Sequence, residues 1–187
     1  MTRYAPIELL TPGHDRSTFD CGSAAQTDWL RRYALVAQQS DTARVYVTCR
    51  PDDRRVAGYY ALAAGAIESG EAPARLRAGV GRHPNPAVIL TRLGVDISDQ
   101  GHGLGQALVR DAFLQTAASA ERIGARALLI HAETAKVVGF YARLDPAFEP
   151  SPADPLQLVL LMKDLRAAIR KAAALREPRA ATPTTGR

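Results

Sequence analysis

A glycine-rich segment between two long apolar stretches constrains this chain more than any other feature of its sequence. The segment, QGHGLG at 100–105, follows an apolar run over 87–95 and leads into an apolar stretch over 103–123. The run is typical of a buried strand, and the stretch is typical of a long, largely buried helix. The first amides of a helix have no partner inside it and lie at the positive end of its dipole. The sequence therefore predicts a phosphate-binding turn between strand and helix.

The spacing of the glycines narrows the kind of phosphate ligand. A dinucleotide fingerprint needs a third glycine where this chain has Gln106, and a P-loop needs a lysine after Gly105. What remains is Gln-x-x-Gly-x-Gly, which resembles the acetyl-CoA loop of the GNAT acyltransferases. Taken alone, the same glycines are also typical of an ordinary turn before a buried helix.

The rest of the chain reads as alternating strands and helices around this loop. Ser23 and Gln26 form a capping-box pattern at the start of a helix on which Trp29, Tyr33 and Val36 share a face. Alternation in the second half predicts a mixed α/β sheet with crossover helices. We expect strands near 7–10, 45–49, 56–67, 87–95, 125–132 and 156–162, and helices over 24–39, 74–78, 103–123, 135–144 and 164–175.

Composition favours one domain and excludes several classes. The chain has 187 residues, 47% of them apolar, without a run of the roughly 18 apolar residues that a membrane span needs. Its start lacks a secretory pattern, and two cysteines without paired spacing indicate neither a disulfide framework nor a metal site. We therefore expect a cytoplasmic protein without a metal. The net charge of +5 comes from residues 163–187, so we divide the chain into a domain over 1–165 and a basic helix with a disordered tail over 166–187.

The segment after the loop resembles the second half of a GNAT site. It reads ALLIHA at 127–132 and continues to a Phe-Tyr pair at Phe140 and Tyr141. The resemblance implies an α/β GNAT fold whose mixed central sheet is splayed between the fourth and fifth strands, with flanking helices. It also implies that the Tyr141 hydroxyl lies near the thioester sulfur of acetyl-CoA. Tyr141 alone would read as a core aromatic, since Val137 and Leu144 share its helical face.

An ordered set of short segments makes the resemblance more specific. The segments lie at 19–22, 44–47, 58–63, 85–86, 88–90, 92–96, 140–141, 150–152, 154–156 and 163–165. In these segments the chain is similar to the tRNA-acetylating GNAT toxins of bacterial type II toxin–antitoxin modules, although it lacks the glycine that usually precedes Phe148. This resemblance implies acetylation of the α-amino group of aminoacyl-tRNA, inhibition by a ribbon-helix-helix antitoxin, and a homodimer. The alternatives are a housekeeping GNAT enzyme that acetylates a small-molecule amine or a protein N-terminus, and a binding module with a decayed site.

The resemblance assigns roles to individual residues. Backbone amides near 93–95 would polarise the acetyl carbonyl, and Tyr141 would be the general acid for the departing sulfur. No compelling general base is present, and Glu133 and His131 are the nearest candidates. An α-amino group has a pKa of about 7.7–8.0, well below that of a lysine side chain. More of it is neutral at pH 7, so its acetylation depends less on a general base. We expect cofactor contacts from Leu93, Gly94, Val95, Gln100, Gly101, His102, Gly103, Leu104 and Gly105. Salt-dependent phosphate contacts are expected from Arg32, Arg44, Arg82 and Arg92.

Overall fold

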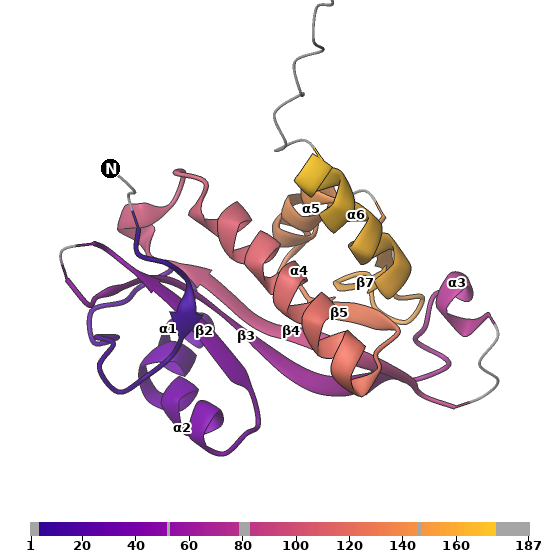
Figure 1. The fold of residues 1–187 in the computed structure, drawn as a ribbon, viewed down its shortest axis with the longest axis horizontal. Coiled ribbons are helices and arrows are strands. Elements are labelled where there is room, and N and C mark those ends of the chain that lie inside the picture. Colours follow the sequence, from indigo (N-terminus) through magenta and orange to yellow (C-terminus); the bar gives the residue numbers. More distant parts are fainter. Residues whose placement is uncertain (1–3, 52, 79–82, 146, 175–187) are drawn as a thin grey trace, which may run out of the picture.

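The computed structural model describes residues 4–51, 53–78, 83–145 and 147–174, and Figure 1 shows their arrangement. Within these residues one mixed sheet has the strand order β1-β2-β3-β4-β5-β7-β6. Its strands are β1 Glu8–Leu9, β2 Arg44–Cys49, β3 Val56–Ile67, β4 Asn85–Val95, β5 Ala127–His131, β6 Glu149–Pro150 and β7 Gln157–Leu161. The helices are α1 Ala24–Asp28, α2 Ala34–Gln39, α3 Ala74–Arg77, α4 Leu104–Ile123, α5 Ala135–Leu144 and α6 Met162–Ala174. A π turn, η1, spans Trp29–Tyr33, and a 3₁₀ turn, η2, spans Ile97–Asp99.

The sheet diverges between β4 and β5, as the GNAT resemblance implies. These two strands are parallel, and their pairing ends at Leu90 and Ile130. On its other side β4 stays paired with β3 as far as Val95 and Gly58. The last part of β4 therefore has a neighbour on one edge only. The GNAT architecture is confirmed, with the splay between the fourth and fifth strands.

Helices cover both faces of the sheet and bury it there. Along β3 the side chains alternate, so Tyr60 joins the core beneath α4 while Tyr59 and Ala61 join the core beneath α1 and η1. Figure 1 shows α4 crossing the strands on the side of α5 and α6, with α1 and α2 on the opposite side. The run 56–62 is accordingly buried throughout. Two packed faces explain why this stretch is apolar rather than alternating.

The first helix differs from the expectation in the face that it buries. Leu30 and Ala34 are fully buried, whereas Tyr33 is 57% and Val36 61% exposed. The π turn over η1 contains an extra residue per turn and so shifts the helical register between α1 and α2. The face drawn from a uniform 3.6-residue period is therefore wrong for Tyr33 and Val36. The other expected strands and helices are confirmed to within a few residues at their ends, whereas β6 and η2 were not predicted.

The C-terminal helix begins before the boundary drawn at 165. α6 starts at Met162, and both Met162 and Leu165 are buried in the main core. The boundary between 165 and 166 therefore falls inside a helix, and the division into two parts stays a proposal. The expected tail lies largely outside the described residues. None of the described helices combines the length and the hydropathy that crossing a membrane requires.

Candidate active site

A small pocket lies where β4 and β5 diverge. Its volume is about 60 Å³. The pocket is lined by Gln26, Leu90, Thr91, Arg92, Leu93, His131, Glu133, Val137 and Tyr141.

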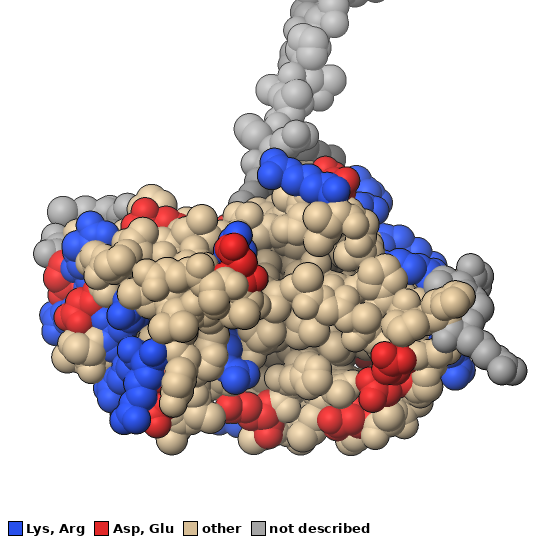
Figure 2. Space-filling model, turned by 90° about the horizontal axis from the view of Figure 1, so that it is seen from below, with Lys and Arg blue, Asp and Glu red and all other residues tan. Residues whose placement is uncertain are grey.

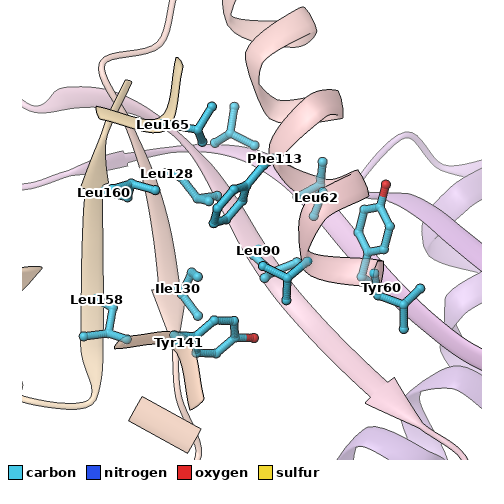
Figure 3. Close-up of a cluster of buried hydrophobic side chains, with 14 of the residues drawn as sticks. Tyr60, Leu62, Leu90, Phe113, Leu128, Ile130, Tyr141, Leu158, Leu160 and Leu165 are labelled. Atoms are coloured by element: carbon cyan, nitrogen blue, oxygen red, sulfur yellow. The ribbon is translucent and has the colours of Figure 1, made fainter. Parts of the chain in front are cut away.

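Tyr141 joins the core through its ring and the pocket through its hydroxyl. The residue is 4% exposed, and its ring contacts Phe140 and Phe148 at centroid distances of 5.2 and 6.0 Å. Its hydroxyl makes no hydrogen bond to any described residue, and Figure 3 shows it directed away from Ile130 into the space toward β4. Burial raises the pKa of the phenol, so the hydroxyl keeps its proton at neutral pH. Such a group can donate a proton or hydrogen bond to an atom in the gap.

The glycine loop presents unpaired amides at the start of α4. Gly101 and Gly103 have φ values of 76° and 81°, which only glycine adopts without strain, and Gly103 is the N-cap of α4. The backbone N–H groups of 101–106 donate no hydrogen bond to any described residue. Unpaired amides with a helix dipole behind them are suited to bind an anion such as a pyrophosphate. Leu104 is buried beneath them and fixes the first turn of the helix.

Gln100 closes the loop rather than extending into it. Its side-chain amide donates to the carbonyl oxygens of Cys21 and Val95, at 3.0 Å each. The loop is thereby folded back against the end of β4 and the chain before α1. Of the cofactor residues expected from the sequence, Gln100 therefore uses its side chain to position the loop.

A buried ion pair anchors the preceding turn. Asp99 has a side chain 7% exposed, and its Oδ2 accepts from Arg50 Nη2 at 2.7 Å and Nε at 3.2 Å. The Tyr4 hydroxyl donates to Oδ1 of the same carboxylate at 3.2 Å. A paired and hydrogen-bonded carboxylate next to Gln100 holds the loop to β2 and to the N-terminal segment. Sequence reasoning missed Arg50 and Asp99, because their separation of 49 residues leaves no local pattern.

The end of β4 supplies the wall of the gap. Gly94 is buried, and a Cβ on it would lie 2.8 Å from Cε1 of Tyr59, so packing excludes any larger residue there. Leu93 and Val95 are half-buried and lie on either side of it. Because N–H groups point to alternate edges along a strand, part of 91–95 directs its amides into the gap that β5 leaves. These amides are available to a carbonyl oxygen of a bound thioester.

The chain resembles proteins of one activity along nearly its whole length. A tRNA-acetylating toxin of Mycobacterium tuberculosis is 42% identical over 169 residues, which cover 90% of this chain and 99% of that protein. The chain belongs to the family of tRNA-acetylating toxins. No protein-family model matches it.

Two solved structures of the toxin AtaT show the same fold. AtaT complexed with acetyl-methionyl-tRNAfMet is 28% identical, with a TM-score of 0.79 over 87% of this chain and 97% of that one. A tyrosine-to-phenylalanine mutant of AtaT, bound to acetyl-CoA and to the C-terminus of the antitoxin AtaR, is also 28% identical. Its TM-score is 0.73, and the match covers 88% of this chain and 97% of that one. The GNAT resemblance stated from the sequence is confirmed.

The arginines expected to contact tRNA differ in their surroundings. Arg92 lines the pocket, its guanidinium carbon is 5.5 Å from the centroid of the Trp29 ring, and its buried Nε has no partner. Arg32 is exposed on η1, with an ion pair of 3.8 Å to Asp28. Arg44 is exposed at the start of β2. Arg82 lies outside the described residues.

Three polar side chains at the mouth of the pocket form a network that sequence reasoning missed. Ser23 caps α1 by accepting from the Gln26 N–H, as the capping-box pattern predicts. The Gln26 side chain, however, donates to Glu133 Oε1 at 2.9 Å, and the Ser23 hydroxyl donates to the same oxygen at 3.1 Å. The capping box was the only local signal. The partner lies 107 residues from Gln26, after β5. Within the described part of the chain no three His, Cys, Asp or Glu side chains cluster as a metal site would require.

Proposed function

We propose that this chain transfers the acetyl group of acetyl-CoA to the α-amino group of an aminoacyl-tRNA and thereby blocks translation. The observation that carries the proposal is the Tyr141 hydroxyl in the gap between β4 and β5, beside the end of a strand that leads to unpaired loop amides. The family supports it, since the relative is a tRNA-acetylating toxin and AtaT is complexed with acetyl-methionyl-tRNA.

The cofactor residues would act mainly through their backbone. The amides of 101–106 would bind the pyrophosphate of acetyl-CoA, and the end of β4 would pair with the pantetheine arm. Amides of Leu93 to Val95 would polarise the carbonyl and stabilise the oxyanion that forms on attack. Tyr141 would donate its proton to the sulfur as the carbon–sulfur bond breaks. His102 and Gly105 would complete the loop, with Leu104 fixing its position.

Basic side chains support an RNA substrate on one half of the molecule. Figure 2 shows Lys and Arg, with some Asp and Glu among them, at the end that carries α1 and α2 in Figure 1, and further Lys and Arg toward α6. Exposed arginines of this half include Arg31, Arg32 and Arg44. Contacts to phosphates would supply most of the affinity there and would weaken as salt rises. Arg92, which lines the pocket, would contact the end of the RNA beside the reacting ester.

The same proposal includes partners and a place in the cell. AtaT binds the C-terminus of AtaR, which supports an antitoxin for this chain as well. We propose that this antitoxin is of the ribbon-helix-helix class and that the chain forms a homodimer, both from the family resemblance. Charged tRNA is used in translation, so the proposed location is the cytoplasm.

Acetyl transfer to charged tRNA tests the function directly. Purified chain with radiolabelled acetyl-CoA is expected to label aminoacyl-tRNA and to leave uncharged tRNA unlabelled. Mild alkaline hydrolysis should then release an N-acetylated amino acid, because the ester breaks and the amide survives. Polyamines, an aminoglycoside and a peptide N-terminus serve as parallel acceptors. Transfer to one of these, with none to charged tRNA, would instead support a housekeeping acetyltransferase.

The pH dependence of the reaction follows from the two groups that exchange protons. The amine attacks in its neutral form, so kcat/KM is expected to rise with pH and to level off near the pKa of the α-amino group, about 7.7–8.0 or lower in an ester. Because burial raises the pKa of Tyr141 above its ordinary value of about 10, no decline from phenol ionisation is expected up to pH 10. Short assays of initial rate, corrected for ester hydrolysis, check both limits. A decline between pH 8 and 9 would contradict a protonated Tyr141.

A further inference from the structure

Glu133 holds a carboxylate at the mouth of the pocket with one oxygen anchored and the other free. Oε1 accepts from the Ser23 hydroxyl at 3.1 Å and from Gln26 Nε2 at 2.9 Å. Oε2 has no hydrogen bond to any described residue, and the side chain is exposed. The carboxylate therefore has a fixed direction and an acceptor open to an incoming group.

The anchor of this carboxylate extends into the core. The Tyr59 hydroxyl donates to the backbone oxygen of Gln26 at 2.7 Å and lies 3.2 Å from its Oε1. Gln26 Oε1 accepts from Tyr59, and the Gln26 amide nitrogen donates to Glu133. The two hydrogen bonds therefore require the same orientation of the Gln26 amide. Tyr59 is fully buried and stacks on Trp29 with an interplanar angle of 13°. The side chain that anchors Glu133 is thus itself held by a buried residue.

Two other polar side chains at the pocket are less suited to receive a proton from an amine. His131 lines the pocket, but its ring makes no hydrogen bond to any described residue, so nothing fixes its direction. Arg92 is a cation and donates hydrogen bonds only. Tyr141, the proposed acid, lines the same pocket. The lining of the pocket thus contains both an anchored acceptor and a protonated donor.

We propose that Glu133 is the catalytic carboxylate for the substrate amine, an inference that rests on the acetyltransferase function proposed above. Oε2 accepts a hydrogen bond from the neutral amine and orients its lone pair toward the thioester carbon. The nitrogen–carbon bond then forms, and the positively charged nitrogen of the tetrahedral intermediate transfers one proton to Oε2. As the carbon–sulfur bond breaks, the sulfur takes the proton of Tyr141. Solvent exchange returns a proton from Glu133 to the Tyr141 oxygen, so the products are an amide and a thiol.

The isosteric variant Glu133→Gln removes the charge and keeps an oxygen for Ser23 and Gln26. We expect its kcat/KM for charged tRNA to decrease by about 100-fold, as for loss of a general base. Acetyl-CoA affinity by calorimetry and the melting temperature should stay those of the wild type. Glu121→Gln, which removes an exposed carboxylate on α4, is the matched control and should keep the wild-type rate.

Chemical rescue separates a catalytic carboxylate from a structural one. Glu133→Ala opens space beside Ser23 and Gln26. Added formate is expected to raise the rate of that variant at least fivefold over its rate without formate, and to leave the wild-type rate unchanged. Glu133→Asp should retain part of the activity. The inference is overturned if Glu133→Gln keeps a rate within twofold of the wild type, if formate restores nothing, or if His131→Gln alone abolishes the reaction. A wild-type chain that does not acetylate charged tRNA would instead remove the proposed function, before any variant is measured.

Discussion

Replacing Tyr141 with phenylalanine is expected to lower kcat for acetyl transfer by about 10²–10⁴-fold, the range for loss of a general acid. The ring would stay packed against Phe140 and Phe148, and only the hydroxyl in the gap would be lost. Acetyl-CoA affinity should remain unchanged, since the proposed contacts of the cofactor are backbone amides of 93–95 and 101–106. Single-turnover kinetics with charged tRNA, together with calorimetry, measures both quantities.

A second tyrosine provides the control for Tyr141→Phe. Tyr46 packs against Tyr60 with ring centroids 4.8 Å apart, and its hydroxyl donates to Gln115 at 3.4 Å, away from the pocket. Tyr46→Phe removes the same atom from a half-buried ring and should leave kcat close to that of the wild type. In cells, expression of the wild type without an antitoxin should stop growth, and Tyr141→Phe should relieve this. A Tyr141→Phe enzyme within threefold of the wild-type kcat would exclude the general-acid role.

Gly103→Val is expected to weaken acetyl-CoA binding by at least tenfold. Gly103 is the N-cap of α4 with a φ of 81°, and a β-branched residue is strongly disfavoured there. The backbone would rotate to relieve the strain, and the unpaired amides of the loop would then point away from a common phosphate position. A tenfold change corresponds to about 1.4 kcal/mol of binding free energy.

The other end of the same helix offers a matched control. Gly124 follows α4 with a φ of 74°, and a Cβ there, as at Gly103, would meet no atom within 4 Å. Gly124→Val therefore introduces backbone strain far from the loop, and more of it, because its ψ of 115° lies outside the left-handed region. It should lower the melting temperature at least as much as Gly103→Val and leave acetyl-CoA affinity unchanged. Equal losses of affinity in both variants would show that the effect reflects general stability rather than the loop.

The sequence by itself determined the elements and their order around the site. The apolar run of β4, the glycines at the start of α4, and Thr134, whose hydroxyl caps α5, are local signals, since each depends on residues a few positions apart. Local signals of this kind also placed Tyr141 on the helix after β5. The sequence allowed two interpretations of Tyr141, a core aromatic and an acid. The structure is compatible with both, because the ring packs in the core while the residue also lines the pocket.

Only the tertiary structure decided which side chains surround the pocket and what fixes them. Gln26 and Glu133, Arg50 and Asp99, and Gly94 and Tyr59 are pairs whose members lie far apart in the chain. A hydrogen bond or steric contact between such residues depends on how strands pair and helices pack. It therefore leaves no periodic pattern in the sequence. The π turn in η1 likewise changed the buried face of the first helix without a local signal. Local chemistry thus sets the elements, and the sheet's divergence brings together the groups that would act on a substrate.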